Sequence, residues 1–206
     1  MYIMSDLLSG IFYINLDKRK DRRVEMEYEL DRMGLQAERF QAIEYAAPNG
    51  IVGCGKSHLQ VIKTAKERGY KNVLVLEDDF VFTVSKTEFQ EHLTKILDPA
   101  IDFDVCFISY NLLEERESDI PFFKRATFSN TASGYIVKSH YFDAIIDLYE
   151  WAMPLLESTG QHWIYANDQV WRSLQEKDKW YCATPRLGVQ SDGFSDNSQR
   201  FISRGV

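Results

Sequence analysis

Short apolar segments alternate with segments of helical periodicity along almost the whole chain, and this alternation constrains the fold more than any other feature. The segment Asn72–Asp79 reads NVLVLEDD, and such a continuous apolar run is typical of a strand that is buried on both faces. Similar segments occur at Gly10–Leu16 and Phe103–Ser109, and apolar residues recur at helical spacing between them. Strands that alternate with helices predict an α/β fold with a mostly parallel central sheet flanked by helices.

Local signals predict where further elements begin and end. Asp17 is expected to cap the first helix and Gly34 to end it, while Ser85 and Glu88 form a capping box. The acidic segment Glu114–Asp119 is expected to be a solvated, mobile loop. Further strands are predicted at Ala37–Ile43, Thr131–Lys138 and Trp180–Gln190, further helices from Gly53, Phe142 and Asn167, and a polar tail at Ser191–Phe201.

The composition is that of one globular domain. The chain has 206 residues, of which 45% are hydrophobic, and this is enough for one sizeable core. Its net charge of −7 argues against nucleic acid as a partner. It does not exclude a phosphate ligand, because basic residues cluster locally at Lys18–Arg23. No run of 18 apolar residues is present and the N-terminus lacks a basic lead, so we expect no membrane span, no signal peptide and a cytoplasmic location. The three cysteines are far apart in the sequence and are expected to be free thiols in a reducing compartment.

Three consecutive carboxylates, Glu77, Asp78 and Asp79, stand where the most apolar strand ends. Successive side chains of an extended chain point to opposite sides, so Glu77 and Asp79 are expected to share one side. Two carboxylates placed in this way suit a hard divalent cation, Mn²⁺ or Mg²⁺, together with the phosphates that it carries. The alternative is a solvated loop that merely begins with acidic residues.

Two further segments carry phosphate-binding signals. Arg19 and Arg22 are three residues apart on the first predicted helix and could meet a diphosphate, or they could belong to a salt-bridged surface helix. The segment GCGKSH, residues 53–58, reads as a glycine-rich helix start whose free N–H groups attract phosphate, but it lacks the spacing of a P-loop. A plain turn into a helix is the alternative there, and His58 is either a donor to a ligand or an ordinary packed histidine.

Four segments together resemble glycosyltransferase family 25, the lipopolysaccharide-biosynthesis and procollagen-galactosyltransferase group. They are YINLDKRKDRR (13–23), GCGKSHLQVIKTAKERGYKNVLVLEDDF (53–80), TASGYIVKS (131–139) and PRLGVQSDGFSDN (185–197). The resemblance implies a GT-A type nucleotide-diphospho-sugar transferase fold, a UDP-hexose donor such as UDP-glucose or UDP-galactose, Mn²⁺ dependence and inversion at the anomeric carbon. The acceptor would be a glycan, a glycolipid or a glycoprotein. Because the chain is short for the family, it is expected to be a single domain, 1–206, or one domain of a longer protein.

The resemblance also implies site residues. In family 25, the sequence EDD stands where other GT-A enzymes carry Asp-x-Asp. By this resemblance, Glu77, Asp78 and Asp79 are expected to form the metal and diphosphate site. Asp196 in the tail is a further candidate metal ligand. The residues expected to bind the donor are Asn15, Leu16, Arg19, Arg22, Ser57, His58, Glu77 and Asp78.

Inversion requires a base that takes the proton of the acceptor hydroxyl, and Asp168 is the predicted base because it lies at a helix start late in the chain. Alternatively, Asn167 and Asp168 simply cap that helix. Asp192 and Asp196 in the tail are rival candidates, either as the base or as additional metal contacts. Among the late aromatic residues, Trp163 and Tyr165 are expected to contact the acceptor.

Two other functions compete with the transferase. A sugar-nucleotide pyrophosphorylase would open with a long glycine-rich loop after the first strand, whereas NLDKRKDRR (15–23) contains no glycine. A non-catalytic nucleotide- or glycan-binding module would be expected to have lost the acidic residues, all of which are present here.

Overall fold

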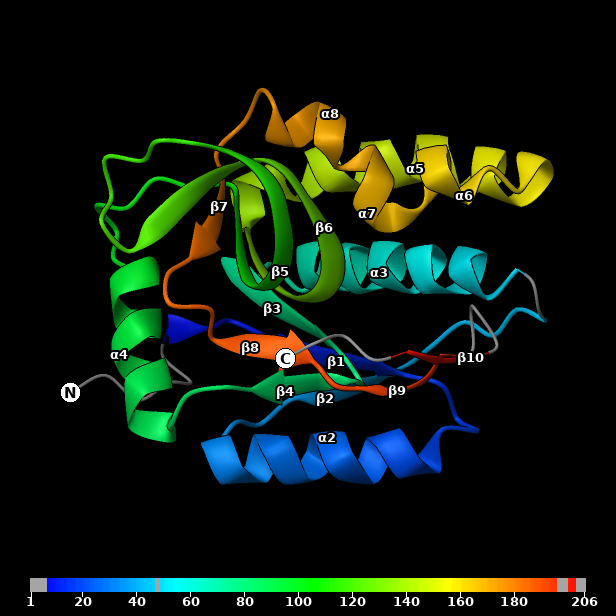
Figure 1. Ribbon diagram of the computed structural model, residues 1–206, viewed down its shortest axis with the longest axis horizontal. Coiled ribbons are helices and arrows are strands. Elements are labelled where there is room, and N and C mark those ends of the chain that lie inside the picture. Colours follow the sequence, from blue (N-terminus) through cyan, green and yellow to red (C-terminus); the bar gives the residue numbers. More distant parts are fainter. Residues whose placement is uncertain (1–6, 47–48, 196–199, 203–206) are drawn as a thin grey trace.

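The computed structural model describes residues 7–46, 49–195 and 200–202. A central sheet lies between two layers of helices (Figure 1). The helices α3 (Gly50–Glu67) and α5 (Phe142–Thr159) pack on one face, and α2 (Lys20–Met33) and α4 (Lys86–Ile96) pack on the other. The predicted α/β layering is therefore confirmed.

The sheet has six strands in the order β2-β1-β3-β6-β5-β7. All strands run in the same direction except β6, which is antiparallel to its neighbours, so the predicted mostly parallel sheet is also confirmed. The strands are β1 Ile11–Asn15, β2 Glu38–Gln41, β3 Asn72–Glu77, β5 Val105–Arg116, β6 Phe123–Lys138 and β7 Trp180–Ala183.

Two of the three helix ends predicted from local sequence signals are confirmed, and one is wrong. Gly34 ends α2 in the left-handed conformation with φ 65°, and Ser85 and Glu88 form the predicted capping box of α4. Asp17 does not cap α2, because two turn residues and Arg19 precede that helix and Arg19 takes the N-cap position. The remaining helical segments are a 3₁₀ turn at Ser139–Tyr141, α6 His162–Tyr165, α7 Asn167–Val170 and α8 Arg172–Gln175.

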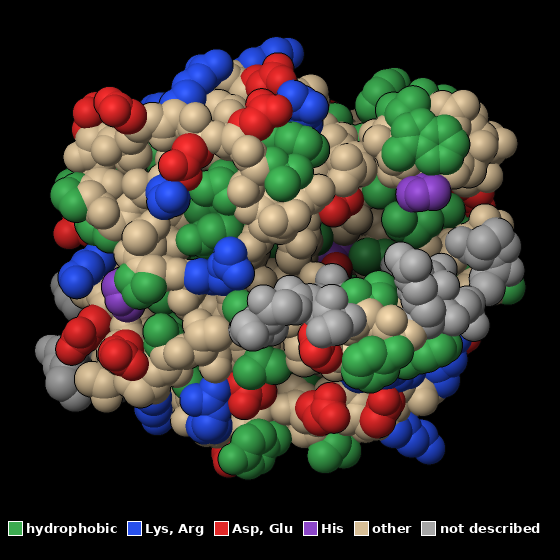
Figure 2. All heavy atoms as spheres, viewed as in Figure 1, with side chains coloured by type: hydrophobic (Ala, Val, Ile, Leu, Met, Phe, Trp, Pro, Cys, Tyr) green, Lys and Arg blue, Asp and Glu red, His purple; other side chains and the backbone are tan. Residues whose placement is uncertain are grey.

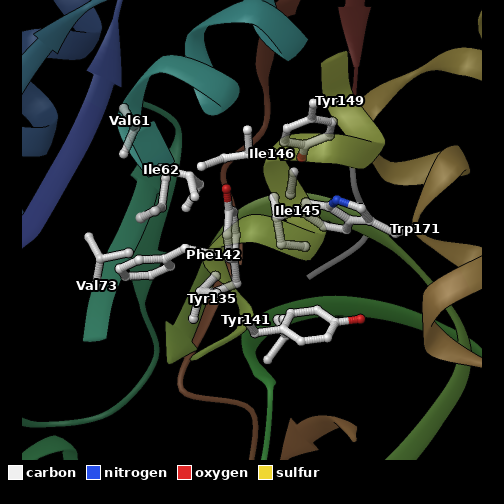
Figure 3. Packing of buried hydrophobic residues seen from close by; sticks show 14 of the residues in the cluster. Val61, Ile62, Val73, Tyr135, Tyr141, Phe142, Ile145, Ile146, Tyr149 and Trp171 are labelled. Carbon is white, nitrogen blue, oxygen red and sulfur yellow. The ribbon is translucent and has the colours of Figure 1, made fainter. Parts of the chain in front are cut away.

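A separate core lies on each face of the sheet. In β3, Val73–Leu76 are 0% exposed, as expected for a strand covered on both faces. Figure 3 shows the core on the α3 side, where Ile62 of α3, Val73 of β3 and Phe142 of α5 converge. Trp171 is fully buried in this core.

Two expectations about the second half of the chain are wrong. Residues Glu114–Arg116 belong to β5, which pairs with β6 up to Arg116 opposite Arg125, so the acidic segment begins as strand rather than loop. Its side chains are solvated, but the ladder satisfies its backbone groups, which composition alone could not indicate.

The predicted strand Trp180–Gln190 is divided into β7 and β8 (Gly188–Gln190), since Pro185 lacks the N–H that a continuing ladder needs. The strand β8 instead pairs with β4 (Phe80–Phe82), which directly follows the acidic residues. Part of the predicted polar tail forms the antiparallel pair β9 (Gly193–Ser195) and β10 (Arg200–Ile202). Among the described helices, none combines the length and the apolarity that crossing a membrane requires.

Candidate functional site

A cavity of about 250 Å³ lies at the carboxyl ends of β1 and β3. The chain leaves β1 through α2 on one face and reaches β3 through α3 on the other, so the crevice between these strand ends stays open, as is usual in α/β sheets. Its lining combines the basic residues Lys18, Arg19 and Arg22 with the acidic residues Glu77, Asp78 and Asp79. Figure 2 shows a hollow on this face of the molecule with acidic side chains inside it.

Asp78 is held between two donors and is 9% exposed. Its carboxylate accepts hydrogen bonds from Asn15 Nδ2 at 2.7 Å and from Arg22 Nη1 at 3.0 Å. Burial raises the pKa of Asp78, and the nearby Arg22 guanidinium opposes this shift. Asp78 is therefore a charge that the fold keeps out of water and neutralises with Arg22.

Glu77 and Asp79 converge on one amide group. Gln190 Nε2 lies 3.2 Å from Glu77 Oε2 and 3.3 Å from Asp79 Oδ1. The expectation that these two carboxylates share one side agrees with this contact, although Asp79 also accepts from Arg22 Nη1 at 3.3 Å because residues 78 and 79 form a turn. Two carboxylate oxygens that surround one point can bind a hard divalent cation.

Behind Glu77 lies a buried chain of hydrogen bonds. His58 is 0% exposed, with Nε2 3.1 Å from Glu77 Oε1 and Nδ1 2.8 Å from the Tyr135 hydroxyl. Because an ionised carboxylate only accepts, Nε2 carries the hydrogen, and Tyr135 donates to Nδ1. His58 thus orients Glu77 and does not line the cavity.

The glycine-rich segment lies inside α3 rather than at its start, since the helix begins at Gly50. The interpretation of Gly53 and Gly55 as a phosphate-binding helix start is therefore wrong, whereas Gly50 does line the cavity. Ser57 is buried, donates to the Gly53 carbonyl at 2.7 Å and accepts from the Ile43 N–H at 2.8 Å. Its hydroxyl joins α3 to the segment after β2 and lies outside the cavity lining.

Both arginines contact β9, and Arg22 also contacts the acidic residues Asp78 and Asp79. Arg19 Nη1 and Arg22 Nη2 donate to the backbone oxygen of Phe194 at 3.2 and 3.0 Å. Leu16 lines the cavity, while Asn15 is 1% exposed and acts through Asp78. The structure therefore brings most of the predicted donor-binding residues together at one place.

Asp168 lies in the first turn of α7, but it does not cap that helix, whose N-cap residue is Ala166 without a side-chain cap. Its Oδ2 accepts a hydrogen bond from the Thr131 N–H at 3.2 Å, and Thr131 has a φ of 83° that is unusual for a residue other than glycine. Burial raises the pKa of Asp168. The capping alternative is thus wrong, and the role as base stays a prediction.

The predicted acceptor residues lie apart from the cavity lining. Trp163 is 64% exposed on α6, and the Tyr165 ring packs 5.8 Å from the Trp151 ring. Asp192 lines a neighbouring hollow together with Asp78 and Asp79, and Asp196 lies outside the described residues.

The sequence-based prediction missed Cys54 and Gln190, which both line the cavity. Cys54 is one helical turn before His58, a spacing that could have indicated a shared face. Gln190 lies within a segment that resembles the family, but no local pattern relates it to Glu77.

Comparisons with known proteins find similar chains among glycosyltransferases. The "Glycosyltransferase 25 family member" of Drosophila pseudoobscura pseudoobscura is 26% identical over 163 residues, which cover 63% of this chain and 26% of that protein. The human "Procollagen galactosyltransferase 2" is 25% identical over 162 residues, covering 62% of this chain and 25% of that protein. The chain thus spans about a quarter of the length of these relatives. No protein-family model matches the chain.

A solved structure supports the fold. It is a glycosyltransferase involved in the glycosylation of the major capsid of PBCV-1, and it superposes with a TM-score of 0.55 at 10% identity over 92% of this chain and 95% of its own. At this identity the likeness concerns the fold alone. In sequence the chain is thus similar to glycosyltransferase 25 family proteins, and in fold it is similar to a solved glycosyltransferase.

Proposed function

We propose that the chain is the donor-binding and catalytic domain of an inverting, metal-dependent glycosyltransferase that moves a hexose from a UDP-sugar to a hydroxyl of a glycan, glycolipid or glycoprotein. The observation that supports this most strongly is the meeting of Glu77, Asp78 and Asp79 with Arg19 and Arg22 in one cavity at the carboxyl edge of the sheet. A metal–diphosphate ligand requires both signs of charge at one place, because the carboxylates bind the cation and the guanidinium groups bind phosphate oxygens.

The donor set of the acidic cluster fits Mn²⁺ or Mg²⁺. Oxygen atoms of Glu77 and Asp79 surround one point, at which Gln190 Nε2 donates to both. A cation bound there would neutralise the charge that builds on the leaving diphosphate. Arg22 Nη1 contacts Asp78 Oδ1 and Asp79 Oδ2, whereas the proposed cation position is beside Asp79 Oδ1, so a dication and Arg22 can share the Asp79 carboxylate. We expect Arg22 to pair with donor phosphate as well.

Asp168 is the proposed general base. Its raised pKa, caused by burial, brings the carboxylate closer to the range in which it can accept a proton effectively at neutral pH. The proton of the acceptor hydroxyl would pass to Asp168 while the hydroxyl oxygen attacks the anomeric carbon opposite the leaving diphosphate, so the configuration inverts.

The similarity to a procollagen galactosyltransferase favours a hexose donor and a protein-linked acceptor. This chain matches only about a quarter of that protein, and Trp163 and Tyr165 lie away from the cavity. The acceptor is proposed to be bound outside the cavity, where the aromatic residues of α6 are candidate contacts for it.

Calorimetry with UDP, with and without Mn²⁺, tests the proposal. UDP should bind more tightly with Mn²⁺, and Asp79→Asn should abolish the metal-dependent part while the thermal unfolding transition stays cooperative. Asp147→Asn is a matched control, because Asp147 is exposed on α5 and does not line the cavity. Absence of UDP binding under both conditions would contradict the proposal.

A further inference from the structure

A thiol, an imidazole and a carboxylate meet beside the acidic cluster. Cys54 and His58 lie one turn apart on α3, and Glu77 is the last residue of β3. One ligand atom from each of these residues lies within 4.8 Å of the other two. We propose that Cys54, His58 and Glu77 form a binding site for a borderline-soft divalent cation, Zn²⁺ or its analogue Co²⁺. This site differs in chemistry from the all-oxygen site of Glu77 and Asp79.

The distances are close to those of a bound metal. Cys54 Sγ lies 3.6 Å and His58 Nε2 lies 3.1 Å from the same oxygen, Glu77 Oε1. With zinc bonds of about 2.0–2.3 Å, ligand atoms of a tetrahedral site are separated by roughly 3.3–3.6 Å. Small movements of side chains therefore suffice to place a cation between the three groups. Three protein ligands leave a fourth position for water, and the cavity supplies access because Cys54 and Glu77 line it.

Surrounding groups suit the ligands. The Tyr135 hydroxyl lies 2.8 Å from His58 Nδ1 and can accept the ring hydrogen when Nε2 binds a metal. Asn167 Nδ2 lies 3.8 Å from Cys54 Sγ, where its N–H can stabilise a thiolate. The carboxylates of Glu77, Asp168 and Asp79 place negative charge near Cys54, and this charge attracts a cation.

The protons balance in a simple way. Without a cation, the thiol S–H and the imidazole Nε2–H both donate to Glu77 Oε1. Cation binding releases the thiol proton to solvent and moves the imidazole proton from Nε2 to Nδ1, where Tyr135 accepts it. One proton is released for each cation bound, and no oxidation or reduction takes place.

This site goes beyond the proposed transferase function, because it takes a thiolate-preferring cation and needs no nucleotide. One consequence does rest on the proposed function: since Glu77 belongs to both sites, Zn²⁺ should inhibit Mn²⁺-dependent UDP binding. Zinc binding and UDP binding are measured separately, so either can fail alone.

Absorption spectroscopy of the untagged, reduced protein titrated with Co²⁺ tests the site. A thiolate-to-cobalt charge-transfer band should appear with visible bands of tetrahedral Co²⁺, and Zn²⁺ should remove both. Cys54→Ser should lose the charge-transfer band. Cys106→Ala is the matched control and should retain it, because Cys106 is a buried thiol of β5.

A second variant keeps the test decisive if Cys54→Ser folds poorly. Tyr135→Phe removes only the hydroxyl that supports His58, and it should weaken Co²⁺ binding roughly ten- to hundredfold while retaining the band at saturation. Absence of the band in the unaltered protein, or a band of equal intensity in Cys54→Ser, would overturn the proposal.

Discussion

Gly53 is the position in α3 where an added methyl group would disturb the site most directly. A Cβ on Gly53 would lie 2.1 Å from the backbone oxygen of Ile43, whereas a Cβ on Gly55 would lie 2.3 Å from Met153 Sδ. The Ile43 backbone is held by its hydrogen bond to Ser57, but the thioether ends a flexible side chain that can rotate away. We therefore predict that Gly53→Ala destabilises the protein and that Gly55→Ala is tolerated.

The magnitude follows from the contact distances. Real Cβ atoms essentially never approach closer than 3.0 Å, so α3 and Ile43 must separate by at least about 0.9 Å, which is 3.0 minus 2.1. Overpacking of this kind costs about 1–3 kcal/mol, while replacing glycine by alanine within a helix gains about 1 kcal/mol. Because the obstructing atom at Gly53 is a backbone oxygen, the overpacking cost there lies at the upper end of this range, and we expect Gly53→Ala to lose about 2 kcal/mol in the free energy of unfolding. Gly55→Ala should change it little.

Urea denaturation followed by far-UV circular dichroism measures both variants. Displacement of α3 also moves Cys54 and the cavity wall at Ile43, so Gly53→Ala should weaken UDP binding and Gly55→Ala should not. The reasoning is refuted if Gly53→Ala is as stable as the unaltered protein, or if Gly55→Ala is the less stable of the two. Glycines that served a phosphate would instead impair UDP binding in both variants without loss of stability.

Three further outcomes are expected. Asp168→Asn should leave UDP binding intact and remove hexose transfer, and full transfer by this variant would dismiss Asp168 as the base. Trp171→Ala should lower the free energy of unfolding by about 3–5 kcal/mol in the same urea assay, because the side chain is fully buried between β6 and α5. Burial and the hydrogen bond to Glu27 raise the pKa of Tyr13 from 10.0 to about 12, so its contribution to stability is present below pH 10 and is lost as the pH rises through 12. Tyr13→Phe should therefore lose less stability than the unaltered protein over this pH range, and identical pH profiles would contradict the assignment.

Local patterns could be read from the sequence because the interactions behind them involve residues that are close along the chain. The capping box joins Ser85 and Glu88, and the left-handed Gly34 ends α2. The buried run Val73–Leu76 and the acidic residues after it predicted both the central strand and the candidate metal site. The acidic strand end of β5 was missed, because its partner β6 decides that it is a strand and its own composition does not.

The sequence by itself determined the class of fold, the place of the acidic residues at a strand end and the family resemblance, since hydrophobic periodicity and short motifs are properties of neighbouring residues. Only the tertiary structure decided which distant side chains contact the acidic residues. Gln190 reaches Glu77 across 113 positions, and Asn15 reaches Asp78 across 63. These contacts depend on strand order and on how α3 and the final strands cross the sheet, and long-range geometry of this kind leaves no local pattern in a single sequence.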